Sequence, residues 1–150
     1  MNKIISLNNL QLKTFTEQDV LDYCSINNIN SDNITVLDLS HNELTDIFGI
    51  KLFKNLKDLY ISYNNITNIS NLKYLNKLEY LFLNNNQITD ISVFPYLNKL
   101  KYLNIGNLEL YSDQIKYIKF LNNLKKLYSS KGFKDILVLN QLNKNIEIIK

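Results

Sequence analysis

At 150 residues, with 45% hydrophobic residues, the chain is long and apolar enough for one domain with a continuous core. Its 17 basic and 14 acidic residues are interspersed and leave a net charge of +3, so no basic block indicates binding to nucleic acid or membrane. All of the basic residues are Lys, Ala is absent and Asn occurs 25 times, which is typical of AT-rich genomes such as those of large insect or amoebal DNA viruses, some low-GC bacteria and apicomplexan parasites.

The first 33 residues are predicted to form a short strand and a helix. Leu7, Leu10 and Leu12 alternate with polar residues and predict a strand at 10–12. The segment 16–19 reads Thr-Glu-Gln-Asp, which is typical of a capping box and predicts a helix over 17–27. The apolar face of this helix is expected to close the end of a core, and the alternative is that it binds a partner; its apolar residues are Val20, Leu21 and Cys24, with Tyr23 alongside.

From residue 34 onward, one pattern repeats at an interval of 22 residues: L-x-x-L-x-L-x-x-N-x-L, with Ile allowed for Leu. Complete copies begin at Ile34, Leu56 and Leu78, and a fourth begins at Leu100. The L-x-L alternation predicts a strand with one buried face, and the constant spacing stacks equivalent residues on adjacent strands. Two buried ladders, each a row of equivalent residues on adjacent strands, are predicted. The first contains Leu37, Leu59, Leu81 and Leu103, and the second contains Leu39, Ile61, Leu83 and Ile105. Asn42, Asn64 and Asn86 are predicted to satisfy backbone groups where each strand ends.

The segments between strands carry apolar residues at steps of three, which suit 3₁₀ or short helical turns. They are Ile47, Ile50, Phe53, then Ile69, Leu72, Leu75, then Ile91, Phe94, Leu97. The fourth repeat departs from the pattern, because Leu108 replaces Asn and the next copy begins 24 residues later at Leu124. We predict that the two extra residues lie between Gly106 and Asp113, and that Ser112 caps a helix whose inward residues are Ile115, Ile118 and Leu121.

The fifth repeat is more irregular still. Leu124 and Leu127 are followed by Ser129, and residues 131–136 resemble the tail of the earlier repeats. Ile146 and Ile149 are predicted to form a last, truncated rung, with Lys144 and Lys150 guarding its open edge.

The repeated pattern resembles that of the leucine-rich repeat family. The tail of each unit, for example residues 86–91, is similar to the 22-residue subclass found in internalins and leucine-rich phosphatase regulators. The resemblance implies an α/β solenoid, with a curved parallel sheet on the concave face and 3₁₀ or short helices on the convex face. We expect an N-terminal cap of strand plus helix over 1–33, and about five repeats over 34–150. Resemblance to this family indicates the fold more specifically than the function.

Residues for catalysis or metal binding are scarce. One His and one Cys cannot supply a nucleophile with its base, none of the three Gly lies in a phosphate-binding loop, and His41 is expected in solvent. Asp46 and Asp90 lie two repeats apart and are expected in turns. We predict no enzymatic activity, cofactor, metal or small-molecule substrate.

Targeting segments and cysteine content indicate the cellular location. The first 12 residues contain no apolar run of signal-peptide length, and no segment approaches the length that spans a membrane. The single Cys, Cys24, excludes an internal disulfide and is expected to be buried in the cap. We therefore expect an intracellular, cytoplasmic protein, inside a host cell if the source is viral.

The positions flanking the buried ladders are predicted to form a binding surface on the concave sheet. Exposed aromatic residues gathered on one face are typical of binding patches. The alternative is that Tyr and Phe occur there because they suit strands. The candidate partner-binding residues are Asp38, Asp58, Tyr60, Tyr63, Tyr80, Phe82, Tyr102, Asn104, Lys126 and Tyr128.

These observations favour a monomeric protein-interaction module that binds a protein partner through its concave face. Two alternatives remain: a regulatory subunit of an enzyme such as a phosphatase, and an RNP scaffold protein. The small net charge and the absence of Arg count against direct contact with nucleic acid.

Overall fold

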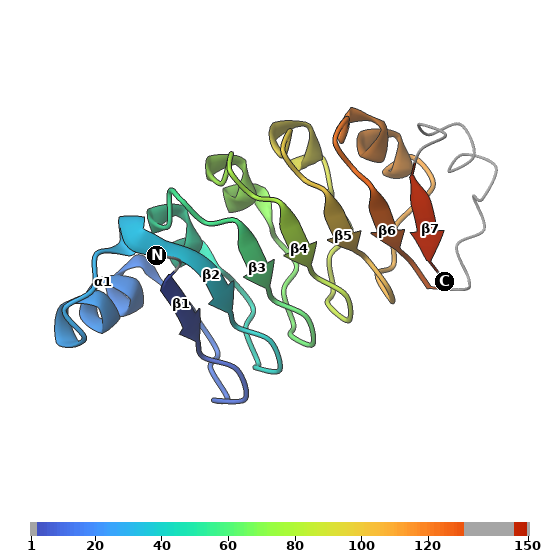
Figure 1. Cartoon of the computed structure of the whole chain (residues 1–150). Helices are drawn as coiled ribbons and strands as arrows, with labels where there is room; N and C mark the ends of the chain where they lie inside the picture. The colour runs from blue at the N-terminus through green and yellow to red at the C-terminus, as the bar shows by residue number, and fades with distance from the viewer. Residues whose placement is uncertain (1–2, 131–145, 150) are drawn as a thin grey trace.

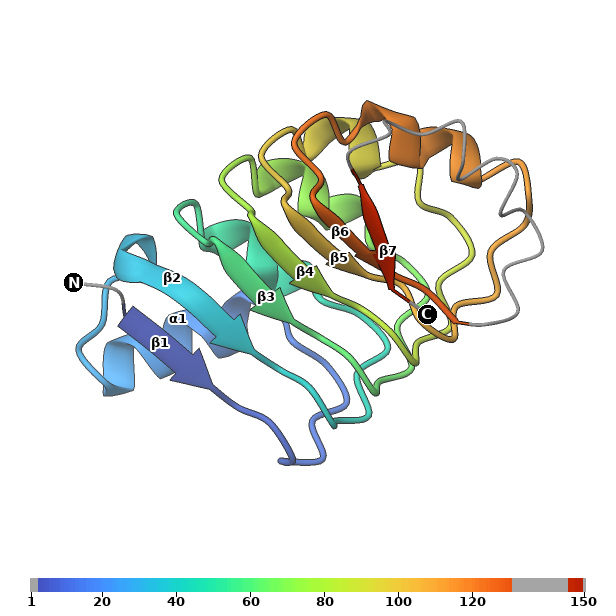
Figure 2. The same cartoon turned by 45° about the vertical axis from the view of Figure 1, so that its right-hand side comes forward.

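The described residues form one open, parallel sheet, and short helices lie along one side of it (Figure 1, Figure 2). The computed structural model describes residues 3–130 and 146–149. Seven strands follow in chain order: β1 (Lys3–Ser6), β2 (Ile34–Asp38), β3 (Asp58–Tyr60), β4 (Tyr80–Phe82), β5 (Tyr102–Asn104), β6 (Lys126–Tyr128) and β7 (Glu147–Ile149). The connections contain α1 (Glu17–Ile26) and the 3₁₀ helices η1 (Ser31–Asn33), η2 (Phe48–Leu52), η3 (Ser70–Tyr74), η4 (Phe94–Tyr96) and η5 (Ile115–Phe120). This confirms the predicted α/β solenoid.

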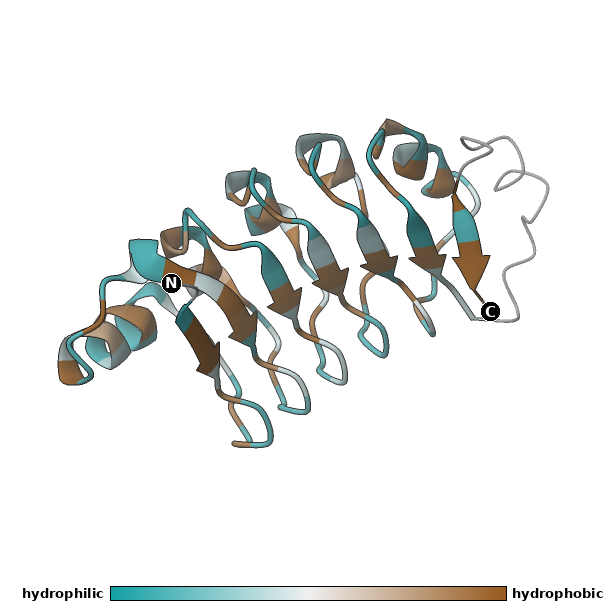
Figure 3. Ribbon diagram, viewed as in Figure 1, coloured by the Kyte–Doolittle hydropathy of each residue, from teal (hydrophilic) through white to brown (hydrophobic). Residues whose placement is uncertain are grey.

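The strand register reproduces the spacing of the repeat. Leu37 pairs with Leu59, and the series continues through Leu81 and Leu103 to Leu127. All five side chains are 0% exposed. Figure 3 shows hydrophobic residues at the same place in neighbouring strands. Both predicted ladders are confirmed, since the second one is buried as well: Leu39, Ile61, Leu83 and Ile105.

Three asparagine side chains, each 8–9% exposed, hold the turns that follow β2, β3 and β4. Asn64 Oδ1 accepts a hydrogen bond from the Leu44 amide at 3.0 Å, and Asn64 Nδ2 donates to the carbonyls of Leu39 and Ile61 at 3.0 and 3.1 Å. Asn42 and Asn86 make the equivalent bonds in their own repeats. Each asparagine satisfies backbone groups where a strand ends, as predicted, and it also joins the backbones of two repeats.

The convex connections bury the predicted apolar residues in 3₁₀ turns, but one expectation about them is wrong. Ser112 does not cap a helix, because η5 begins at Ile115 with Gln114 at the N-cap and has no side-chain cap. Apolar residues at steps of three suit the i to i+3 bonding of a 3₁₀ helix, and the Leu121 amide donates to the Ile118 carbonyl at 3.0 Å. Ile115, Ile118 and Leu121 are buried, as predicted.

The first strand is β1, so the predicted strand at 10–12 is wrong. Ile5 pairs with Leu37 and is 2% exposed, which places it in the buried ladder. Leu10 corresponds in register to Asn42 of the next repeat and is 55% exposed. Residues 7–12 match the L-x-x-L-x-L pattern, but they are not aligned with the strands of the other repeats. The reason is that α1 takes the place of a 3₁₀ turn and makes the first repeat longer than the others.

Helix α1 begins at the predicted capping box. The Asp19 amide donates to Thr16 Oγ1 at 3.2 Å, and the Asp19 carboxylate accepts from the Thr16 amide at 2.7 Å. The predicted apolar face is only partly inward, because Val20 is buried whereas Leu21 is 55% exposed. Cys24 is half-buried and not fully buried as expected, although this burial raises the pKa of its thiol.

The last described strand, β7, pairs with β6 one residue out of the predicted register. Ile148 faces Leu127 in the buried ladder, and Ile149, which was predicted there, faces Tyr128 instead. The fifth repeat is shorter than 22 residues, which a constant spacing could not anticipate. The expectations for residues 131–136, Lys144 and Lys150 lie outside the described residues.

Candidate functional site

Two rows of side chains point away from the core on the concave face of the sheet, because successive residues of a strand alternate between its faces. The register aligns one row as Val36, Asp58, Tyr80, Tyr102, Lys126 and the other as Asp38, Tyr60, Phe82, Asn104, Tyr128. All of these residues are half-buried. We call them the concave patch, and it contains nine of the ten predicted site residues.

Four aromatic rings stack in pairs at the centre of the concave patch. The ring centroids of Tyr60 and Phe82 lie 5.0 Å apart with an interplanar angle of 15°. Those of Tyr80 and Tyr102 lie 4.5 Å apart at 6°. Stacking of this kind stabilises ring pairs beyond simple burial and limits their rotation. The four rings therefore form an ordered, partly exposed apolar platform across β3, β4 and β5.

The end of the concave patch nearest β2 is acidic. Asp38 Oδ1 accepts a hydrogen bond from the Ser40 amide at 2.9 Å, whereas the Asp58 carboxylate has no hydrogen bond or ion pair among the described residues. Burial, reinforced by Glu79 and opposed by Lys57, raises the pKa of Asp58. Burial and the nearby carboxylates also raise the pKa of Tyr60. This end of the patch would therefore favour a positively charged group.

At the opposite end of the concave patch, the charge of Lys126 is paired. Lys126 Nζ lies 3.1 Å from Glu147 Oε2 of β7, and this hydrogen bond raises the pKa of Lys126. Next to the patch, Lys101 Nζ lies 2.5 Å from Glu79 Oε2. Both lysine charges are balanced locally, so the acidic end is the more distinctive one.

Tyr63 lies beside the concave patch, in the turn after β3, and stacks on His41. The two ring centroids are 4.4 Å apart, and the Tyr63 side chain is 50% exposed. His41, Tyr63, Asn85 and Asn107 hold the same position in successive repeats, with φ of 56–57°. Asn adopts this left-handed conformation readily, whereas it is strained for Tyr. Sequence reasoning missed the contact with His41, although the spacing of 22 residues pairs the two positions.

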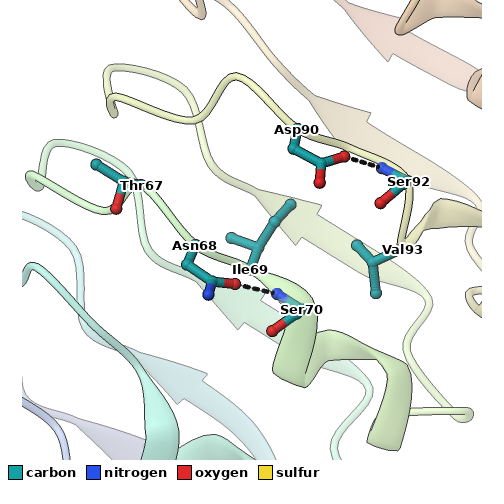
Figure 4. A pocket seen from close by; sticks show the side chains of 7 residues that line it. All are labelled: Thr67, Asn68, Ile69, Ser70, Asp90, Ser92 and Val93. Carbon is teal, nitrogen blue, oxygen red and sulfur yellow. Dashed lines mark hydrogen bonds between the residues drawn. The ribbon is translucent and has the colours of Figure 1, made fainter.

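A small cavity of about 200 Å³ lies between the turns of the second and third repeats (Figure 4). Two of its polar side chains already hold the local backbone, because Asn68 Oδ1 accepts from the Ser70 amide and Asp90 Oδ1 from the Ser92 amide, both at 2.8 Å. In the part of the chain that the structure describes, no three His, Cys, Asp or Glu side chains are placed to hold a metal. We therefore interpret this cavity as a gap between two turns.

Among residues 3–130 and 146–149, no helix is long and apolar enough to cross a membrane.

Comparison with known proteins supports the predicted resemblance. A family model described as "Leucine Rich repeats (2 copies)" matches residues 32–74 and 76–113, which is more than half of the chain. No curated protein sequence gave a significant match.

Several solved structures are similar. An internalin (inlF) from Listeria monocytogenes has 31% identity and a TM-score of 0.71, over 79% of this chain and 35% of that one. A leucine-rich repeat protein from Leptospira interrogans has 27% identity and a TM-score of 0.77, over 93% of this chain and 35% of that one. Internalin C2 from Listeria monocytogenes has 26% identity and a TM-score of 0.68, over 98% of this chain and 73% of that one. The chain thus spans about a third of the length of the first two.

Proposed function

The chain belongs to the leucine-rich repeat family, and we propose that it is an interaction module that binds a protein partner on the concave face of its sheet. Leucine-rich repeat proteins generally mediate protein–protein interaction and are generally not enzymes. The observation that carries the proposal for this face is its central platform of stacked aromatic rings.

Central aromatic residues are the type of side chain that most often dominates binding energy at protein interfaces. Tyr60, Tyr80, Phe82 and Tyr102 lie on three adjacent strands and are already ordered by their stacking. Binding of a partner would therefore cost little conformational entropy in these side chains. Tyr hydroxyl groups at the same place can also form hydrogen bonds with the partner.

The acidic end of the concave patch gives the partner an orientation. Asp58 is partly desolvated and lacks a cationic partner among the described residues, so a Lys or Arg of the bound protein would relieve an unfavourable charge. Complementary charge of this kind sets orientation and association rate more than affinity. We expect the bound segment to place a basic residue over Asp38 and Asp58, and apolar residues over the aromatic rings.

The size of the concave patch limits its affinity. Five strands at ~4.8 Å spacing, each about three residues long, offer on the order of 300 Å². A standard interface uses about 800 Å² from each partner. The turn with His41 and Tyr63 adjoins the patch and would extend the contact. We therefore expect moderate affinity unless the partner also contacts this turn.

Quantitative affinity capture with paired variants tests the proposal. The full chain would be used as bait in a lysate of its source cells, alongside a variant carrying Tyr80→Ala and Phe82→Ala. We expect proteins recovered by the wild type to fall by about tenfold or more with this variant, because it removes two central anchors. Both side chains are only half-buried and face away from the core, so the chain should stay folded, with a modest fall in the thermal unfolding midpoint from the lost stacking.

The matched control carries Tyr74→Ala and Tyr96→Ala, two exposed aromatic residues on the convex side. In a lysate cleared of membranes, this variant should recover the same proteins as the wild type. Retained recovery with the concave pair, or loss of recovery with the convex pair alone, would contradict binding at the concave face.

A further inference from the structure

In the four repeats between β2 and β6 the fold separates positive and negative charge to opposite edges, whereas the first connection, residues 15–33 with α1, carries four acidic residues and no lysine. Segments 48–57, 70–79, 92–101 and 115–125, which lead into the strands, contain ten lysines and one acidic residue, Glu79. Segments 40–47, 62–69, 84–91 and 106–114, which follow the strands, contain five acidic residues and no lysine. Because all strands run in the same direction, the basic segments gather along one edge (Figure 1). In the sequence these lysines are spread over four repeats and form no basic run.

Exposed aromatic side chains lie among these lysines. Tyr74, Tyr96 and Phe120 occupy equivalent places in successive repeats and are 44%, 59% and 44% exposed. We define the convex ridge as these three residues and the lysines in and beside the 3₁₀ helices: Lys51, Lys54, Lys73, Lys77, Lys99, Lys116 and Lys119. Among the described residues only one of these lysines forms an ion pair, that of Lys51 with Glu17. The other charges are available to an anionic partner.

The lysines also contact the aromatic rings. Lys54 Nζ and Lys73 Nζ lie 5.3 and 5.2 Å from the ring centroid of Tyr74, and Lys119 Nζ lies 5.2 Å from that of Phe120. Each of these ammonium groups therefore lies over a ring and remains at the surface, so that apolar and charged atoms face the same partner.

We infer that the convex ridge binds the surface of an anionic lipid bilayer. Aromatic rings with flanking lysines suit the headgroup region, where the rings enter the apolar boundary and the ammonium groups pair with lipid phosphates and carboxylates. A convex ridge, unlike a concave face, is not held away from a nearly flat bilayer by the flanking repeats. Single-stranded nucleic acid instead binds in grooves and stacks its bases on free ring faces, and lysines partly cover those of Tyr74 and Phe120. The concave patch lies on the other face of the rungs and would remain free for a protein.

Vesicle co-sedimentation of the full chain tests this inference. Vesicles of equal parts phosphatidylcholine and phosphatidylserine should bind the chain, vesicles of phosphatidylcholine alone should not, and raised salt should weaken the binding. Lys73→Gln with Lys99→Gln should weaken binding to the mixed vesicles by about tenfold or more. Lys3→Gln with Lys13→Gln removes the same charge away from the ridge and should leave binding unchanged.

An aromatic pair of variants tests the apolar part of the ridge. Tyr96→Ser should reduce binding to the mixed vesicles severalfold, whereas Tyr111→Ser, which alters a 72% exposed residue outside the ridge, should not. The inference is overturned if the wild type does not bind the mixed vesicles, or if the two lysine pairs weaken binding equally. Tighter binding to single-stranded polyuridylate than to the mixed vesicles would also overturn it, in favour of a nucleic-acid partner.

Discussion

Single buried polar side chains determine how neighbouring repeats are joined. Asn64 satisfies backbone groups from two repeats, so replacing it leaves buried donors and acceptors without partners. We expect Asn64→Ala to lower the free energy of unfolding by about 1–3 kcal/mol, measured by urea denaturation. Asn65→Ala, at the exposed neighbouring position, should change it by less than about 0.5 kcal/mol. Equal effects of the two substitutions would contradict the role of the asparagine ladder.

Gly49 is required by the close approach of α1 to η2. A Cβ atom there would lie 2.8 Å from Val20 Cγ2 and 2.9 Å from the Phe15 carbonyl oxygen, and closer still to the Thr16 carbonyl oxygen. We expect Gly49→Ala to cost about 1–3 kcal/mol of stability, because backbone atoms cannot move aside easily. At Gly106 the atom nearest to an added Cβ would be Asn104 Oδ1 at 3.2 Å, so Gly106→Ala should cost less stability. Thermal denaturation of both variants measures the difference. A greater loss with Gly106→Ala would show that helix packing is not the constraint.

Asp58 is expected to reduce stability at neutral pH. Its pKa in the folded chain is raised above the ordinary value of 3.8, so the folded state holds the proton more tightly than the unfolded state does. The contribution of Asp58 to stability therefore falls as pH rises through this window. Asp58→Asn should raise the urea midpoint at pH 7 and leave it unchanged well below the ordinary pKa.

The control for this substitution is Asp32→Asn, which removes one negative charge from an exposed position. It should give no gain at either pH. A gain from Asp58→Asn that persists in acid would contradict the assignment to a desolvated carboxylate. A stability cost at an exposed face is common at binding sites, where a residue serves the partner more than the fold.

At the scale of elements, the regular repeats and helix α1 were predictable, whereas the register of the first and last strands was not. Leu37, Leu59 and Leu81 set the register because a constant interval leaves one alignment of buried faces. The first strand was misplaced because α1 lengthens its repeat, so Leu7, Leu10 and Leu12 carry the pattern without its register. The last rung was displaced by one residue because its repeat is shorter. Local periodicity cannot detect either change in length.

The strand and helix of residues 1–33 are proposed to cap the core. β1 pairs along β2, and α1 packs on η2 beside the buried Ile50. Removing residues 1–31 should expose the edge of β2 together with apolar side chains, and exposed edges of this kind promote aggregation. We expect the fragment 32–150 to aggregate in light-scattering measurements at concentrations where the full chain stays monodisperse. A soluble fragment with a cooperative melt would contradict the cap.

At the scale of the whole molecule, the concave patch could be predicted from the sequence and the convex ridge could not. The concave patch was predictable, because alternation within a strand and the constant interval place Tyr60, Tyr80 and Phe82 on one face. The ion pair of Lys126 with Glu147 was not, because it depends on the strand that follows an irregular repeat. The convex ridge was missed because its lysines are separated along the chain and meet only when the repeats stack.

The central claim is that a protein partner sits on the concave patch, and site-specific photo-crosslinking tests it most directly. The photoreactive residue p-benzoylphenylalanine would replace Tyr80 in one full-length chain and Tyr111 in another, and both would be irradiated in a lysate of the source cells. We predict a discrete protein adduct at position 80, mapped by mass spectrometry, and none at position 111, which is exposed but lies outside the patch. Adducts at position 111 with none at position 80 would contradict the proposed interaction surface.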